Sequence, residues 1–176
     1  MQNIPIYVVL VDETDDEHGM MEKMEAHRKG VLHRAVSVFI FNSKGEWLLQ
    51  QRALNKYHCP GKWSNTSCTH PIQNETYEEA ASRRLYEEMG IRTQLTQEFQ
   101  FVYRAELDHD LIEHEYDTVF MGVSDELPVL NAEEACSFRY LSTSELDREI
   151  SASPDLFTPW FLKLYPRIKV LIDEKI

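Results

Sequence analysis

Hydrophobic residues run in short, β-branched blocks through the first third of the chain, and these blocks predict strands. Ile4–Val11 predicts a buried strand. Ala35–Asn42 and Trp47–Arg52 predict two more, and the turn residues Ser43–Gly45 between them indicate a hairpin. The segment Met20–Lys29 is polar, holds helix formers and ends next to a glycine, so it predicts a helix.

A long loop and a well-marked helix are predicted next. Asn55–Asn74 carries prolines, a glycine and many Ser, Thr and Asn residues, which predicts a loop of a length that is often functional. A helix then begins at Thr76, which forms a capping box with Glu79, and ends at Gly90. Hydrophobic residues recur along one side of this helix: Tyr77, Ala81, Leu85 and Met89.

Further strands follow this helix. Phe99–Leu107 and Glu115–Val123 are predicted strands on either side of a polar turn, and Phe138–Leu141 is a short strand. Ser142 begins another helix through a second capping box with Glu145. The order of strands, helix, strands and helix predicts an α/β fold in which helices flank a mixed β-sheet.

The end of the chain predicts one more helix. It covers Asp155–Ile176, and Pro159 and Pro166 are expected to interrupt it. Since no repeat or linker divides the sequence, residues 1–176 are expected to form one domain, with a core at about 30–165.

The chain is strongly acidic. It has 176 residues and a net charge of −12, with 43% hydrophobic and 27% charged residues, as in ordinary globular proteins. Because phosphate backbones and anionic lipids attract basic surfaces, this charge argues against nucleic-acid and membrane-surface partners. A small anionic substrate is compatible with it if metal ions and a few local cations receive that substrate.

The sequence predicts a cytoplasmic protein. Its N-terminus has no basic region and turns acidic at once, and no hydrophobic run approaches the length of a membrane span. We expect a monomer or a weak homodimer. Cys59, Cys68 and Cys136 are then expected to be free thiols rather than a disulfide framework.

Histidine and glutamate side chains offer a candidate metal site. His27, His33 and His70, with Glu113 and Glu115, suit a borderline divalent ion such as Zn²⁺ or Mn²⁺. The two glutamates lie two residues apart in a predicted strand, so their carboxylates share one face. Spacing alone does not bring the histidines together, so scattered polar side chains are the alternative. The other histidines are expected to be of that kind: His18, His58, His109 and His114.

The segment from Thr69 to Ile91 resembles an altered Nudix motif. The matching residues are Glu75, Arg83, Leu85, Glu87, Glu88, Gly90 and Ile91. Thr69 stands where that motif has glycine, and Arg84 stands where its catalytic run has the first glutamate. In Nudix hydrolases the glutamates of this run bind the Mg²⁺ ions that activate water on a pyrophosphate. A guanidinium there reverses the charge, so efficient pyrophosphate hydrolysis is not expected.

Several segments together resemble type I isopentenyl-diphosphate isomerases, a family built on the Nudix fold. The resemblance covers roughly residues 5–165, and its most specific part is the Asn-X-X-Cys-X-His-Pro pattern that contains Cys68. The matching segments are Glu25–Phe41, Gln51–Lys56, Trp63–Pro71, Arg83–Gly90, Phe101–Glu106, Glu113–Phe120 and Thr158–Phe161.

The resemblance implies an activity in isoprenoid biosynthesis. Such an enzyme interconverts isopentenyl and dimethylallyl diphosphate by adding a proton at C4 and removing one at C2. Cys68 and Glu115 match the catalytic cysteine and glutamate, with Tyr103 beside the glutamate. Which of the two gives the proton and which takes it stays open.

The resemblance also implies metal ions and substrate contacts, and no flavin. His27, His33, His70, Glu113 and Glu115 match the ligands of one Zn²⁺, Mn²⁺ or Mg²⁺ ion. Glu88 matches a carboxylate that helps to hold a Mg²⁺ ion arriving with the diphosphate. The remaining matches contact the small isoprenoid diphosphate, its charged end or its tail: Lys23, Arg52, Lys56, Arg84 and Trp160.

Two other functions compete with this hypothesis. A Nudix pyrophosphohydrolase is the main alternative, although Arg84 and Thr69 disfavour it and Cys68 has no place in it. A Nudix domain without activity, used as a binding module, is the second. Asp117 extends the strand face of Glu113 and Glu115 and has no assigned role.

Overall fold

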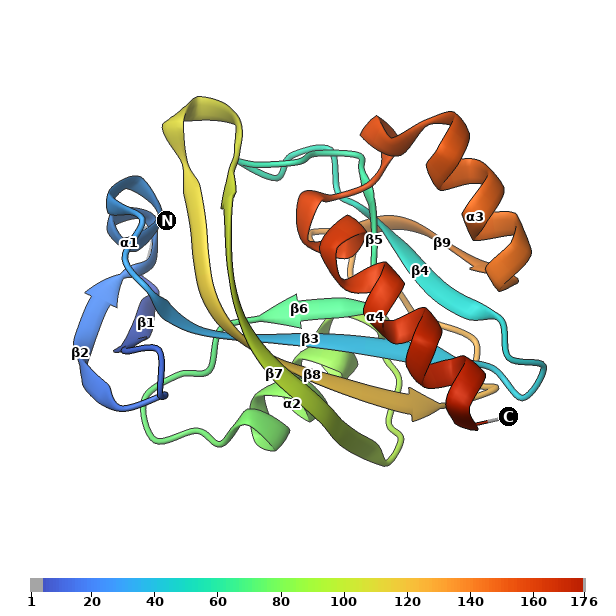
Figure 1. Cartoon of the computed structure of the whole chain (residues 1–176), viewed down its shortest axis with the longest axis horizontal. Coiled ribbons are helices and arrows are strands. Elements are labelled where there is room, and N and C mark those ends of the chain that lie inside the picture. Colours follow the sequence, from blue (N-terminus) through green and yellow to red (C-terminus); the bar gives the residue numbers. More distant parts are fainter. Residues whose placement is uncertain (1–4, 176) are drawn as a thin grey trace.

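The computed structural model describes residues 5–175, in which nine strands pair into one mixed sheet (Figure 1). The strands are β1 (Tyr7–Val11), β2 (Glu17–Glu22), β3 (His33–Phe41), β4 (Trp47–Arg52), β5 (Trp63–Ser64), β6 (Ser67–Thr69), β7 (Leu95–Glu106), β8 (Ile112–Val123) and β9 (Ala135–Leu141). The helices are α1 (Lys23–Lys29), α2 (Tyr77–Met89), α3 (Thr143–Ala152) and α4 (Pro159–Lys175), with 3₁₀ turns at Asp108–Asp110 and Pro154–Leu156. No described helix is long and apolar enough to cross a membrane.

Strand β3 organises the sheet. It pairs antiparallel with β1, β4 and β6, and parallel with β8 along its whole length. Strand β7 forms a long hairpin with β8, and β9 and β5 pair with β4. The predicted hairpin of β3 and β4 is confirmed, with Phe41 opposite Trp47.

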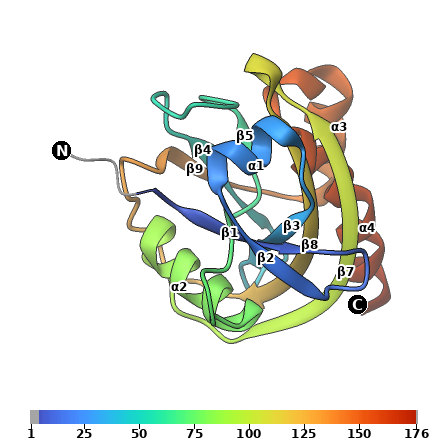
Figure 2. The same cartoon turned by 90° about the vertical axis from the view of Figure 1, so that its left-hand side faces the viewer.

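The two faces of β3 carry two separate cores. Val38 and Ile40 pack with Leu85 of α2, whereas Phe39 and Phe41 pack with Phe161 of α4. This alternation follows from the two-residue period of a strand. Figure 2 shows the result, in which the strands lie between α2 on one side and α3 and α4 on the other. The predicted α/β fold, a mixed sheet flanked by helices, is confirmed.

Helix α2 begins and ends as the sequence predicts. The Thr76 hydroxyl accepts a hydrogen bond from the Glu79 N–H, and the Glu79 carboxylate accepts one from the Thr76 N–H. Gly90 ends the helix in the left-handed region, with φ of 69°. The capping box at Ser142 and Glu145 likewise begins α3.

The helix predicted for Met20–Lys29 is wrong in its first part. Residues up to Glu22 belong to β2, in which Met20 and Met21 lie opposite Val9 and Val8 of β1. Pairing with a neighbouring strand therefore overrides the local helix preference. The predicted strand Ile4–Val11 is confirmed from Tyr7 onward, and Ile4 lies outside the described residues.

Two other expectations also need correction. The segment Asn55–Asn74 contains β5 and β6, whose backbones pair with β4 and β3. Helix α4 is continuous through Pro166, and Pro159 begins it instead of interrupting it. A proline suits the first turn of a helix because the N–H it lacks would have no partner there. Pro166 lies on the exposed side of α4, away from the core.

Candidate active site

One cavity of about 390 Å³ opens at the end of the sheet where β3, β6 and β8 meet. It gathers most of the site residues that the sequence predicts, although they are far apart along the chain. The predicted residues among its lining are Lys23, Arg52, Lys56, Cys68, His70, Arg84, Glu88, Tyr103, Glu113, Glu115 and Trp160. His27 and His33 lie behind this lining and are fully buried.

The sheet register explains how Cys68 and Glu115 come to share this cavity. Cys68 of β6 lies opposite Ser37 of β3, and Glu115 of β8 lies opposite His33 of β3. Because His33 and Ser37 are four residues apart in one strand, their side chains point to the same face. Cys68 and Glu115 therefore reach that face from opposite sides of β3.

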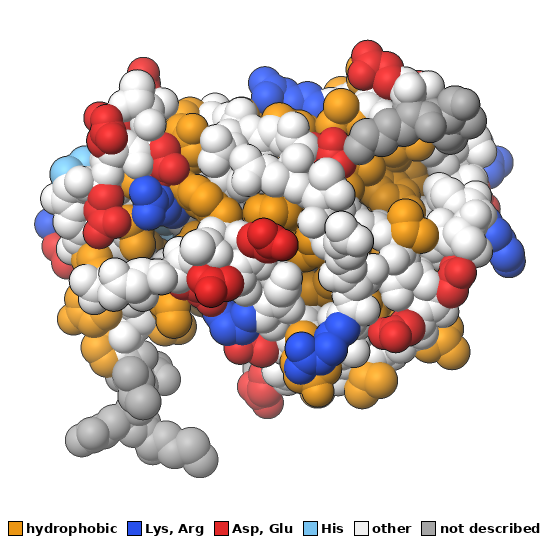
Figure 3. Space-filling model, turned by 90° about the horizontal axis from the view of Figure 1, so that it is seen from below, with side chains coloured by type: hydrophobic (Ala, Val, Ile, Leu, Met, Phe, Trp, Pro, Cys, Tyr) orange, Lys and Arg blue, Asp and Glu red, His pale blue; other side chains and the backbone are white. Residues whose placement is uncertain are grey.

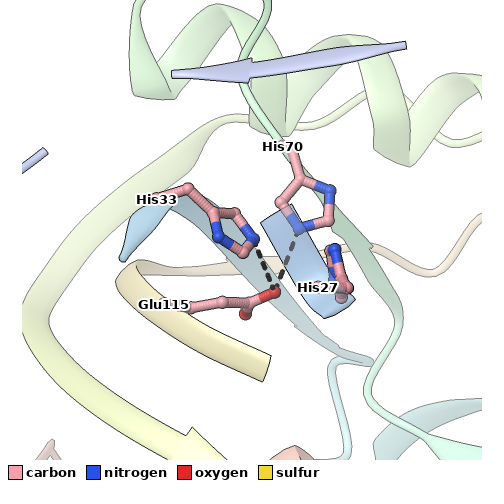
Figure 4. Close-up of side chains that lie close together, drawn as sticks. All are labelled: His27, His33, His70 and Glu115. Carbon is pink, nitrogen blue, oxygen red and sulfur yellow. Dashed lines mark hydrogen bonds and ion pairs between the residues drawn. The ribbon is translucent and has the colours of Figure 1, made fainter. Parts of the chain in front are cut away.

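Three histidines and Glu115 form a compact cluster, drawn in Figure 4. One potential ligand atom from each of His27, His33, His70 and Glu115 lies within 4.8 Å of all the others. His70 Nε2 is 3.0 Å from Glu115 Oε1, and His33 Nε2 is 3.7 Å from the same oxygen. The residues come from α1, β3, the loop after β6, and β8. The fold therefore brings together side chains whose spacing in the sequence does not predict a cluster.

Backbone carbonyls orient two of these imidazoles. Nδ1 of His27 lies 2.7 Å from the Lys23 carbonyl, and Nδ1 of His33 lies 2.8 Å from the Val31 carbonyl. A carbonyl only accepts, so each Nδ1 carries the proton and each Nε2 has a free lone pair. Both Nε2 atoms are buried without a hydrogen-bond partner in the described structure, as expected for metal ligands.

Burial keeps the imidazoles of this cluster neutral. It lowers the pKa of His33 to about 3, with the neighbouring His70 adding to the effect, and it lowers the pKa of His27 and His70 as well. Neutral imidazole is the form that binds a metal ion. Three imidazoles and one carboxylate fit a divalent ion such as Zn²⁺ or Mn²⁺.

Glu113 lies beside this cluster and is held in another way. Its Oε2 accepts a hydrogen bond of 2.9 Å from the Tyr103 hydroxyl, and its Oε1 lies 3.4 Å from His58 Nε2. The Tyr103 hydroxyl is also 2.6 Å from Glu115 Oε2. Burial, followed by the charge of Glu115, raises the pKa of Glu113 well above its usual value.

Cys68 is held as a thiol on the opposite wall. Its Sγ donates to Asn65 Oδ1 at 3.3 Å, and the Asn65 amide nitrogen donates to the carbonyls of Val38 and Ser67. That arrangement fixes the Asn65 oxygen as the acceptor. Burial, with the charge of Glu88 next, raises the pKa of Cys68, so the sulfur keeps its proton.

Asp117 lies behind the cavity wall and does not line it. It is fully buried, and its Oδ2 accepts a hydrogen bond of 2.7 Å from the Ser37 hydroxyl. Burial and the charge of Glu115 raise its pKa to about 8. Asp117 therefore braces Ser37, the residue opposite Cys68 in the sheet.

Basic side chains from several elements line the cavity. Arg84 contacts Glu88 at 2.7 Å, and Arg52 lies over the Trp160 ring at 5.2 Å from its centre. Lys23 lies over the Tyr57 ring, and burial lowers its pKa. Elsewhere charge is mixed: the face drawn in Figure 3 shows acidic, basic and hydrophobic side chains interspersed.

The chain resembles known proteins over most of its length. A model of the NUDIX domain family matches residues 31–161. A protein of Pectobacterium atrosepticum named isopentenyl-diphosphate Delta-isomerase is 52% identical, over 92% of this chain and 90% of its own length. A protein of the same name from Photobacterium profundum is 50% identical, over 88% of this chain and 89% of its own. The chain belongs to the isopentenyl-diphosphate Delta-isomerase family of NUDIX-domain proteins.

Solved structures agree on the fold of this family member. A protein from Deinococcus radiodurans superposes with a TM-score of 0.77 at 22% identity, covering 92% of this chain and 98% of its own. A MutT protein from Methanosarcina mazei has a TM-score of 0.64 at 22% identity, covering 78% and 93%. At these identities the likeness shows the fold alone. The Nudix-like architecture predicted from the altered motif is thereby confirmed.

Three cavity residues of this isomerase-family chain were missed from the sequence. His58, expected to be a scattered polar residue, is buried beside Glu113, with its ring centre 5.6 Å from that of Trp160. Tyr57 precedes it and faces Lys23. Glu134, just before β9, contacts both Lys56 and Arg84. Only the turn residues around His58 signalled a functional loop, and no pattern marked Glu134.

Proposed function

We propose that the chain interconverts isopentenyl diphosphate and dimethylallyl diphosphate, as part of isoprenoid biosynthesis. The observation that supports this most is the pair of proton-carrying groups, Cys68 and Glu115, in the wall of one cavity. They reach it from opposite sides of β3, which suits two groups that act on a flat alkene between them. Family membership, at 52% identity to a named isomerase, supports the same reaction.

The reaction moves a double bond by two proton transfers. A proton is added at C4, which leaves a tertiary carbocation at C3, and a proton is then lost from C2 to form the new double bond. Glu115 and the Tyr103 hydroxyl form one proton-transfer group, joined by their 2.6 Å hydrogen bond. Cys68, held by Asn65, forms the other. General acid–base catalysis of this kind contributes about 10²–10⁴-fold in rate.

The carbocation needs a dry site with a stabilising surface. Trp160 is 3% exposed, and Ser64 accepts its indole N–H at 2.9 Å, so the ring is fixed in the cavity wall. A cation over an indole face is stabilised by about 2 kcal/mol when desolvated. The buried Trp160 and the half-buried Cys68 limit the access of water to the carbon skeleton, where water would capture the cation.

The His27, His33, His70 and Glu115 cluster would hold one divalent ion, Zn²⁺, Mn²⁺ or Mg²⁺, whereas Glu113 lies outside this cluster and accepts a hydrogen bond from Tyr103. When bound, that ion supplies positive charge that lowers the pKa of a carboxylate ligand. The imidazoles would fix its place, since the Nε2 atoms of His27 and His33 are free and the four side chains are close together.

The diphosphate anchors the substrate and does no chemistry. Lys23, Arg52, Lys56 and Arg84 would receive its oxygens, and Glu88 would help to hold a Mg²⁺ ion that arrives with it. Carboxylate and phosphate oxygens are the ligands that Mg²⁺ prefers. Binding energy from this remote end then holds the alkene between Cys68 and Glu115. The proposed reaction needs no flavin. We still predict that the protein is a monomer or a weak homodimer in the cytoplasm.

The test is incubation of the protein with isopentenyl diphosphate and Mg²⁺ in D₂O. We expect dimethylallyl diphosphate that carries deuterium from solvent. No product and no exchange would overturn the proposal. Release of phosphate from nucleoside polyphosphates without isomerisation would favour the Nudix hydrolase instead, which Arg84 in the metal-binding run disfavours.

A further inference from the structure

A single carboxylate oxygen joins two of the cavity's cations. Oε2 of Glu134 contacts the Lys56 ammonium, and it lies 2.6 Å from Nη2 of Arg84. Lys56 comes from the loop after β4 and Arg84 from α2, so Glu134 joins side chains from two different elements. All three side chains are about one-fifth exposed and line the cavity.

The backbone of Glu134 is itself fixed. Its carbonyl accepts the Ala53 N–H at 3.0 Å, and its N–H donates to the Asn131 carbonyl at 2.9 Å. The carboxylate therefore extends from a backbone segment that two hydrogen bonds hold in place. Lys56 and Arg84 lower its pKa against the effect of burial, so it is charged at neutral pH.

The charges of Lys56 and Arg84 are matched by neighbouring carboxylates. Arg84 contacts three carboxylates, those of Glu87, Glu88 and Glu134. Lys56 contacts Glu134 as well, so the two cations face at least as many anions. A bare diphosphate close enough to contact Lys56 and Arg84 is also close to the carboxylate of Glu134. Both groups are negatively charged, and they repel each other strongly in a half-buried site.

We propose that Glu134 makes diphosphate binding depend on a divalent cation. It holds Lys56 and Arg84 side by side while cancelling part of their charge, so the bare anion is rejected. A diphosphate with its metal ion brings less negative charge and meets less repulsion. This inference rests on the proposed function only in taking this end of the cavity as the diphosphate subsite.

The test measures the affinity of inorganic pyrophosphate by titration calorimetry, with and without Mg²⁺, for the wild type and for Glu134→Gln. Glutamine keeps the shape and one acceptor oxygen but loses the charge. We expect the ratio of the two affinities to fall by about tenfold in Glu134→Gln, mainly through tighter binding of bare pyrophosphate. Mg²⁺ also associates with pyrophosphate in solution. This association is the same in both experiments, so it cancels when the affinity ratios of the two proteins are compared.

The matched control is Glu133→Gln, which removes the same charge from the next residue. Glu133 is exposed and contacts neither Lys56 nor Arg84 in the described structure. We expect its affinity ratio to equal that of the wild type. An unchanged ratio in Glu134→Gln, whether or not both affinities weaken, would overturn the inference and leave Glu134 a structural support.

Two further outcomes separate this inference from the proposed function. A wild type that does not bind pyrophosphate at all overturns the inference, even if it isomerises isopentenyl diphosphate. A wild type that shows the Glu134 effect but no isomerisation supports the inference while overturning the proposed reaction. Thermal melting verifies that each variant is folded, and Glu134→Ser repeats the neutral substitution if the glutamine variant does not fold.

Discussion

The Tyr103 hydroxyl lies 2.6 Å from Glu115, and the two residues are direct partners in the antiparallel pair of β7 and β8. The same hydroxyl is 2.9 Å from Glu113. It thus stands between two buried carboxylates that would otherwise face each other with like charge. A hydroxyl has one proton to donate, so the two hydrogen bonds cannot both form at full strength while both carboxylates are ionised.

Tyr103→Phe is therefore expected to slow the reaction without loss of pyrophosphate or metal binding. The variant removes the hydroxyl and keeps the ring, which stacks on Phe101 with centroids 5.4 Å apart. We expect kcat to fall by about 10²-fold, because Glu115 loses its proton partner. Pyrophosphate affinity and bound-metal content should stay at the wild-type level. Steady-state kinetics and elemental analysis check this, and an unchanged kcat would remove Tyr103 from the catalytic group.

Cys68 offers a second test of the proton transfers. Cys68→Ala is expected to lower kcat by about 10³-fold or more, since it deletes one of the two proton carriers. Pyrophosphate should still bind, because the basic residues that line the cavity are untouched. Cys136→Ala is the control: that thiol is exposed and donates to the carbonyls of Gln51 and Arg52. Equal activity of both variants would contradict a proton-transfer role for Cys68.

The sequence predicts the scaffold of this site better than its interior. Capping boxes, turn residues and the two-residue period locate α2, α3, β3 and β4, because these signals act over a few neighbouring positions. Strand β2 was missed because pairing with β1, not local preference, decides its structure. Helix α4 runs through Pro166 because that residue lies on its exposed side.

The arrangement of side chains inside the site depends on contacts between segments that are far apart in the sequence. His27 and His70 meet only because α1 and the loop after β6 pack against the start of β3 and β8, which no local spacing encodes. The family resemblance supplied the site residues that composition could not. It did not supply His58 or Glu134, whose contacts with Glu113, Lys56 and Arg84 are visible only in three dimensions.

Metal binding to the histidine cluster should stabilise the folded protein. The ligand atoms of His27, His33, His70 and Glu115 lie together only when the chain is folded, so a bound ion shifts the equilibrium toward that state. At an ion concentration about 100 times Kd, the gain in free energy of unfolding is about 2.7 kcal/mol. Thermal melts with and without Zn²⁺ or Mn²⁺ measure it.

The control for this stabilisation is His33→Asn. Asparagine is smaller than histidine and removes one imidazole ligand, so the metal-dependent rise in Tm should shrink or vanish. His109→Asn changes a histidine in the exposed β7–β8 turn and should keep the full rise. Equal rises in the two variants would show that the ion binds elsewhere.

The final prediction concerns stability at Gly90, which ends the Nudix-like helix and so positions Glu88. Gly90 has φ of 69°, and a Cβ there would lie 2.9 Å from Val129 Cβ and 3.1 Å from the Val129 carbonyl oxygen. Gly45 has a similar φ of 76°, but a Cβ there would meet nothing within 4 Å. Gly45→Ala thus carries only the cost of a left-handed backbone, about 1–2 kcal/mol. Gly90→Ala should cost about 1–3 kcal/mol more, since the Val129 backbone has to move. Urea unfolding of both variants measures the difference between their free energies of unfolding. Equal losses of stability would mean that the segment around Val129 moves aside without a cost in free energy.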